Sequence, residues 1–137
     1  MGVILDSSIV VRAERQRVPV KSLLKDILTI TKDQNAALSA VGLTELIHGL
    51  YRASTPEIRL RRQNFLDELM RDVTVYPFTK ETAMLAGRVD GEQRERGIVV
   101  PFPDLLIGAT ALHLGYAVLT ANERHFRLIP ELQVLVI

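Results

Sequence analysis

The sequence predicts an α/β fold of three layers, with a mostly parallel central sheet of about five strands covered by helices on both faces. Two features predict it. First, short apolar runs without polar alternation, such as residues 3–5, are typical of strands that are buried on both faces. Second, longer segments with apolar residues at helical spacing separate these runs, and strands that alternate with helices form parallel sheets with right-handed crossovers.

Residues 1–137 fit a single domain, which is large enough to bury a core without disulfides or a structural metal. The expected strands are residues 3–5, 36–39, 73–76, 117–120 and 133–137. The expected helices are residues 9–17, 20–32, 42–52, 56–71, 80–90 and 104–114. A helix precedes the second, third and fourth strands, so each of them can be reached by a crossover.

Local signals define the ends of several helices. Thr55 offers a capping hydroxyl and Pro56 suits the first helical position, while Thr79 can cap the following helix in the same way. Pro103 suits a first turn at the start of the last helix, and Gly115 ends that helix. These signals fix where the strands between the helices begin.

Composition excludes several classes of function. The chain has no cysteine, which excludes disulfides, thiolate zinc sites and cysteine nucleophiles. Seventeen basic and sixteen acidic residues give a net charge of +1, too small to attract nucleic acid by bulk field, so any basic surface must be local. No stretch approaches the roughly 18 apolar residues of a membrane span or forms a signal sequence. We therefore expect a soluble, cytoplasmic protein with no membrane contact.

Polar side chains with metal-binding capacity recur at one edge of the predicted sheet. Asp6 follows the first strand, Glu45 lies in the helix after the second, Asp104 starts the helix before the fourth, and Asn122 follows the fourth. The carboxyl ends of parallel strands share one edge, where open α/β sheets bind ligands. We expect these four residues to form the catalytic site.

Each acid also has an ordinary explanation when taken alone. Asp6, Ser7 or Ser8 could cap the next helix, Glu45 could be a solvated helix residue, and Asp104 could offset the helix dipole by about 0.3–1 kcal/mol. Together, carboxylates a few Å apart repel by about 4 kcal/mol per pair, so a cation is expected among them. Oxygen ligands without thiolates or paired histidines favour Mg²⁺ or Mn²⁺, bound by Asp6, Glu45 and Asp104. The natural chemistry of such an ion is phosphodiester hydrolysis.

Four segments resemble, in order and spacing, those of PIN-domain ribonucleases, and in particular the VapC toxins of bacterial toxin–antitoxin pairs. They are residues 3–8, 43–46, 101–109 and 119–126. The resemblance implies a PIN-like fold and a Mg²⁺- or Mn²⁺-dependent endoribonuclease that a cognate antitoxin inhibits and that usually forms a homodimer. Asp6, Glu45 and Asp104 match the family's acids and Thr120 its hydroxyl. Asn122 stands where many members have a fourth acid, and it can coordinate through its amide oxygen but adds no charge.

Other readings of the pattern fit less well. A phosphoacceptor receiver domain has an acidic pair after its first strand and a haloacid-dehalogenase phosphatase has Asp-x-Asp, but here Asp6 is alone and Ser8 takes the second position. Glu45 and His48 match half of a di-iron motif that has no second copy. A non-catalytic RNA-binding module of PIN-like fold is the alternative from another class. With four Phe, three Tyr and no Trp, it would bind through arginines rather than by base stacking.

The helix at residues 56–71 combines arginines with apolar residues. We interpret it as amphipathic, with an RNA-facing or partner-facing basic patch as the alternative. Its arginines are Arg59, Arg61, Arg62 and Arg71. Apolar helix surface that could bind partners is expected around Leu46, Leu50, Leu60 and Phe65.

Overall fold

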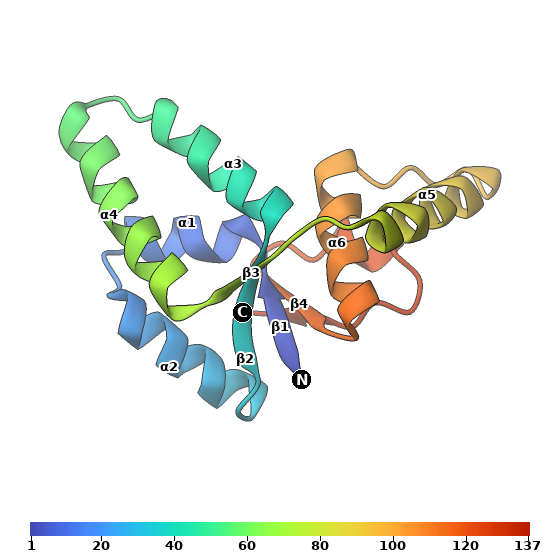
Figure 1. Cartoon of the computed structure of the whole chain (residues 1–137), viewed down its shortest axis with the longest axis horizontal. Helices are drawn as coiled ribbons and strands as arrows, with labels where there is room; N and C mark the ends of the chain where they lie inside the picture. The colour runs from blue at the N-terminus through green and yellow to red at the C-terminus, as the bar shows by residue number, and fades with distance from the viewer.

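A computed structural model describes all 137 residues and contains one five-stranded sheet in the order β3-β2-β1-β4-β5 (Figure 1). Every neighbouring pair of strands is parallel, so the predicted α/β class is confirmed and the sheet is parallel throughout. The strands are β1 Gly2–Leu5, β2 Asn35–Ser39, β3 Thr74–Tyr76, β4 Ala117–Thr120 and β5 Val134–Val136.

Six α-helices and one short 3₁₀ helix surround the sheet. They are α1 Ser7–Arg15, α2 Val20–Thr31, α3 Ala40–Tyr51, α4 Pro56–Asp72, α5 Lys80–Glu95, α6 Phe102–Leu114 and the 3₁₀ helix η1 Phe126–Leu128. The end of α5 and the start of α6 differ from the predicted boundaries. The helix α6 begins before Asp104, which therefore lies in its first turn, and α5 continues past Gly91 because Gln93 is buried.

Two hydrophobic cores lie on opposite faces of the sheet and create the three layers. In β1, Val3 and Leu5 join the core formed with α1 to α4, while Ile4 joins the core formed with α5 and α6. Figure 1 shows these two groups of helices on either side of the strands. Because β1 is central and buried on both faces, the residue that follows it is held in a fixed place.

The strand register brings the ends of β1 and β4 together. Leu5 pairs with Leu119, and the amide of Asp6 donates to the Leu119 carbonyl at 2.9 Å. Asp6 and Thr120 are therefore adjacent at the carboxyl edge of the sheet. At the end of β2, Ser39 caps α3 by accepting a hydrogen bond from the amide of Gly42 at 2.9 Å. These three junctions build the edge where the acids were expected.

Three of the four arginines of α4 are engaged with α1 or α3 rather than forming a free basic face, and Arg71 is exposed. Arg61 forms a 2.8 Å ion pair with the buried carboxylate of Glu14 on α1, and Arg62 lies 3.8 Å from the same group. The side chains of Arg59 and Arg62 also donate to the carbonyls of Leu50 and Gly49 on α3. The amphipathic interpretation therefore fits α4, because these arginines tie it to α1 and α3.

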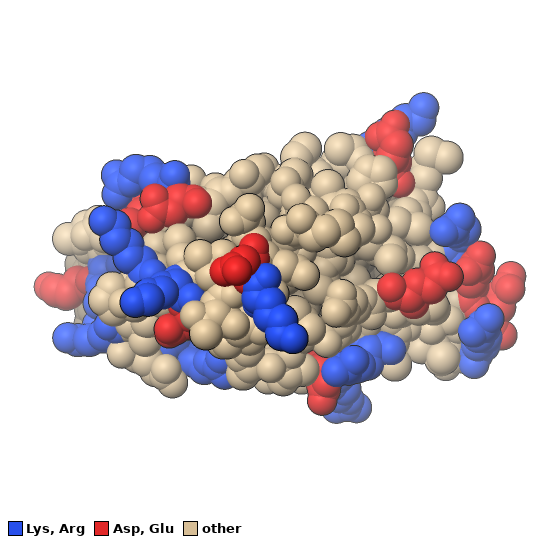
Figure 2. All heavy atoms as spheres, turned by 90° about the horizontal axis from the view of Figure 1, so that it is seen from below, with Lys and Arg blue, Asp and Glu red and all other residues tan.

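Two of the four residues expected at a partner-binding apolar surface are buried, although both line a groove between α1, α3 and α4. Leu46 and Leu50 are only 8% and 5% exposed, because α3 and α4 turn these side chains inward toward α1. Leu60 on α4 is exposed and Phe65 is partly buried. None of the helices is both long enough and apolar enough to cross a membrane. On the side seen in Figure 2, Lys and Arg lie beside Asp and Glu, so no extended face of one sign is present there.

Candidate active site

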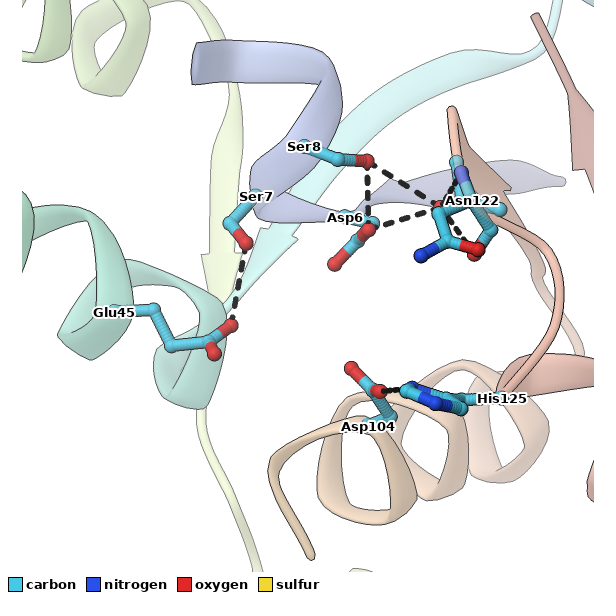
Figure 3. Close-up of polar contacts among 8 residues, drawn as sticks. Asp6, Ser7, Ser8, Glu45, Asp104, Asn122 and His125 are labelled. Atoms are coloured by element: carbon cyan, nitrogen blue, oxygen red, sulfur yellow. Dashed lines mark hydrogen bonds and ion pairs between the residues drawn. The ribbon is translucent and has the colours of Figure 1, made fainter. Parts of the chain in front are cut away.

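Asp6 connects the end of β1 to the start of α1 and is 7% exposed. It occupies the N-cap position, but its side chain makes no capping bond. Instead Oδ2 accepts hydrogen bonds from the hydroxyls of Ser8 at 2.7 Å and Thr120 at 2.9 Å. The capping alternative therefore does not explain this side chain, which two hydroxyls orient at the sheet edge (Figure 3).

The loop after β4 is tied to the same group. The hydroxyl of Thr120 accepts from the amide of Asn122 at 3.0 Å, and the hydroxyl of Ser8 accepts from the amide of Ala121 at 3.1 Å. Asn122 is exposed, and its side-chain amide makes no hydrogen bond within the chain. Asn122 thus lies at the predicted edge with its amide available to a ligand.

Glu45 lies in the second turn of α3, which Ser39 caps at the end of β2. Its Oε1 accepts a hydrogen bond from the Ser7 hydroxyl at 3.3 Å, and the residue is partly buried. Figure 3 shows the carboxylate on the same side of the edge as Asp6 and Asp104. A solvated helix position therefore does not describe Glu45.

Asp104 lies in the first turn of α6, where its charge also compensates the helix dipole. Its Oδ2 is 2.7 Å from Nδ1 of His125, which precedes η1. The sequence offered Ser7 and Ser8 only as helix caps and gave no role to His125, whereas their side chains contact Glu45, Asp6 and Asp104. His125 belongs to the segment at residues 119–126, but no spacing rule relates it to an acid on another helix.

The three carboxylates lie in one electrostatic environment. Burial raises the pKa of Glu45, and the charges of Asp6 and then Asp104 raise it further, whereas the hydrogen bond from Ser7 lowers it. Burial also raises the pKa of Asp104, and Asp6 adds to this, although the hydrogen bond and charge of His125 oppose it. The charge of Asp6 therefore acts on both Glu45 and Asp104 across the crevice.

Each of the three carboxylates keeps one oxygen without a hydrogen bond. Asp6 Oδ1, Glu45 Oε2 and Asp104 Oδ1 have no donor within the chain, and none of them is sealed from solvent. As placed, the side chains are not close enough to form a ready group of three ligands around one point. The site therefore offers separated hard oxygen donors rather than a closed cage.

The raised pKa of Glu45 gives a stability that depends on pH. The contribution is fully present below the unfolded pKa, near the ordinary value of 4.5, and is lost as pH rises through the higher folded pKa. In EDTA, Glu45→Gln should therefore match wild type at about pH 4 and melt higher than wild type at about pH 7.

Paired thermal melts across this range measure the effect. Glu92→Gln, on an exposed part of α5, controls for the loss of a negative charge. A difference between Glu45→Gln and wild type that stays constant or shrinks with rising pH would contradict a raised pKa of Glu45.

Comparison with known families adds an independent observation. The PIN domain family model matches residues 3–132, which include all four predicted site residues. The chain belongs to the PIN-domain family. It is 31% identical over 137 residues to "Ribonuclease VapC" of Rickettsia bellii and to "Ribonuclease VapC1" of Rickettsia felis, covering all of this chain and 97% of each relative.

Solved structures share the PIN fold. A chain of VapBC2 from Rickettsia felis, bound to a promoter DNA fragment, superposes with a TM-score of 0.83 at 23% identity, over 98% of this chain and 97% of that chain. A chain of DNA-bound VapBC from Salmonella typhimurium gives a TM-score of 0.81 at 21% identity, over 98% and 96%. At these identities the likeness shows the fold, and the resemblance predicted from four segments is confirmed at the level of the PIN family.

Proposed function

We propose that this PIN-domain protein is a Mg²⁺- or Mn²⁺-dependent endoribonuclease and the toxin of a toxin–antitoxin pair. The observation that carries the proposal is the set of three carboxylates at one sheet edge, each with one free oxygen. The two relatives from Rickettsia are named ribonucleases, which is consistent with this chemistry.

The donor set suits a hard divalent cation. Asp6, Glu45 and Asp104 offer carboxylate oxygens and Asn122 an amide oxygen, while the chain has no thiolate. Mg²⁺ usually keeps several waters and binds through one or two carboxylates, so separated donors fit it better than a closed cage would. We therefore assign Asp6, Glu45 and Asp104 to the metal site, where they would hold the ion directly or through the waters that it keeps.

Hydroxyl groups orient two of the carboxylates of the site. Ser8 and Thr120 fix the carboxylate of Asp6, and Ser7 holds one oxygen of Glu45. The exposed amide of Asn122 can donate to a phosphate oxygen at the mouth of the site. A bound divalent ion would lower the pKa of a water molecule and neutralise charge on the phosphoryl oxygens.

The same geometry argues against a non-catalytic RNA-binding module. Three carboxylates repel an RNA backbone unless a cation lies among them. The side chains of Arg61 and Arg62, which could have attracted RNA, lie against the buried carboxylate of Glu14 instead. The site therefore favours metal-dependent cleavage over binding by charge alone.

Metal removal tests the proposal. Purified protein should cleave single-stranded RNA with Mg²⁺ or Mn²⁺ and lose the activity in excess EDTA, and restoring the ion should restore it. Sequencing the 5′ ends of the fragments would identify the bonds that are cut. Cleavage that continues undiminished in EDTA would contradict a metal-dependent mechanism.

We also propose where an antitoxin binds. A groove of about 340 Å³ lies between α1, α3 and α4, and it is lined by apolar residues together with Arg15 and Arg52, which form no ion pair. Ser7 and Glu45 also line it, so a chain segment bound there would reach the acid edge. Relatives of this fold are described as VapBC complexes and as a toxin–antitoxin complex from Klebsiella pneumoniae. An apolar segment with acidic residues fits this groove.

A charge reversal in the groove tests this assignment. Arg52→Glu should weaken binding of the co-expressed antitoxin, because it repels an acidic segment, and should leave cleavage by the free protein unchanged. Arg88→Glu, at an exposed position of α5 outside the groove, is the matched control. Equal antitoxin affinity of the two variants would contradict the assignment.

A homodimer stays a prediction that light scattering checks.

A further inference from the structure

We propose that His125 is a positioning residue that orients Asp104 for the divalent cation. The inference rests on the proposed function, since it assigns a role toward the same site. His125 Nδ1 lies 2.7 Å from Asp104 Oδ2, and the two residues come from different parts of the chain, the loop after β4 and the first turn of α6. Figure 3 shows the ring on the side of Asp104 that is turned away from Glu45.

The chemistry of the pair fixes the direction of the hydrogen bond. An ionised carboxylate only accepts, so whenever Asp104 is ionised the proton lies on His125 Nδ1, and Asp104 Oδ2 is occupied. The Oδ1 atom of Asp104 has no donor in the chain and stays free for a cation. Because the last torsion of aspartate is broad, a carboxylate without such a partner would sample many orientations.

The backbone that carries His125 is held from two helices. Phe126, the next residue, is 1% exposed in the core formed with α5 and α6. Gln93 of α5 donates to the Leu128 carbonyl at 2.7 Å. In α6, Gly108 has no side chain, and a Cβ there would collide with the tip of Ile129.

These contacts make the pair rigid. The segment that follows His125 packs on α6, the same helix that carries Asp104. Outer partners that orient metal ligands act in this way, and their loss typically costs about 10–100-fold in metal affinity or activity. The ring of His125 thus acts through Asp104 rather than on the substrate.

Three variants of His125 separate this role from the others. An asparagine amide reaches the place of Nδ1, a glutamine amide reaches the place of Nε2, and alanine reaches neither. His125→Ala and His125→Gln should bind Mn²⁺ about 10–100-fold more weakly than wild type, and His125→Asn should recover most of the affinity. Electron paramagnetic resonance of free Mn²⁺ measures this without RNA. His113→Ala, at an exposed position of α6, is the control.

Cleavage assays complete the test. For His125→Ala, the Mn²⁺ concentration at half-maximal rate should rise while the rate at saturating Mn²⁺ stays close to that of wild type. Melts in EDTA check that each variant is folded. Unchanged Mn²⁺ affinity in both His125→Ala and His125→Gln would overturn the proposal.

A loss of rate at saturating Mn²⁺ with normal Mn²⁺ affinity would also overturn it, because the ring would then act on the substrate. A wild-type protein that binds Mn²⁺ but cuts no RNA would remove the proposed nuclease function. In that case the Mn²⁺ affinities of the variants would still decide the role of His125.

Discussion

Replacing Asp104 by Asn should abolish RNA cleavage and yet raise the thermal stability of the protein in EDTA. The substitution keeps the shape of the side chain and removes one ligand charge. A catalytic ion contributes several kcal/mol, and each 1.36 kcal/mol is tenfold in rate, so cleavage should fall by about 100-fold or more. In EDTA, wild type holds a carboxylate whose pKa is raised by burial and by Asp6, and the neutral amide avoids that cost. The expected gain is on the order of 1 kcal/mol, because solvent and relaxation screen the repulsion.

The helix-dipole explanation of Asp104 predicts the opposite sign. If the charge only compensated the dipole of α6, its removal would cost about 0.3–1 kcal/mol in EDTA. With saturating Mg²⁺ or Mn²⁺ the difference in stability between Asp104→Asn and wild type should shrink or change sign, because wild type binds the ion better and is stabilised by that binding. Paired melting curves of the two proteins, with EDTA and with metal, distinguish these cases. A variant that melts lower in EDTA, with a wild type unshifted by metal, would mean that the acids do not share an ion.

Much of the fold followed from local patterns because the sheet is buried on both faces. Residues 3–5 and 117–120 are unbroken apolar runs, and they form the paired central strands β1 and β4. Because these strands are parallel, their carboxyl ends lie at one edge of the sheet. Asp6 follows β1 and Thr120 ends β4, so both were expected at that edge. The helix α5 was predicted too short, because Gly91 suggested an end while the burial of Gln93 on η1 extends the helix.

The contacts between distant residues could not be predicted in the same way. The bond between Asp104 and His125 and the ion pair between Glu14 and Arg61 join side chains on separate elements. Periodicity assigns a residue to a face of its own helix but does not say which neighbour that face meets. The arginines of α4 were therefore open to two interpretations until the packing of α4 on α1 decided between them.

Substitutions of Phe126 should lower the stability of the core and also affect the site, because Phe126 directly follows His125. Its ring is 1% exposed and packs in the core with α5 and α6, directly after His125. Phe126→Ala should lower the free energy of unfolding by about 3–5 kcal/mol, since it removes a buried aromatic ring and leaves a cavity. Phe126→Leu keeps most of the volume and should cost less than about 1.5 kcal/mol. Urea unfolding with a constant m-value measures both changes.

Phe102→Ala is the matched control, because that ring is 68% exposed at the start of α6 and its loss should change stability by about 0.5 kcal/mol or less. The site is then tested in Phe126→Leu, which stays folded. A leucine fills most of the space but lacks the flat ring that packs in this core. The backbone of His125 therefore gains freedom, and Mn²⁺ affinity should fall even though no metal ligand has changed. If Phe126→Leu bound Mn²⁺ as tightly as wild type, packing of η1 would not contribute to the orientation of His125. A stability loss below about 1 kcal/mol in Phe126→Ala would mean that the ring is not part of the core.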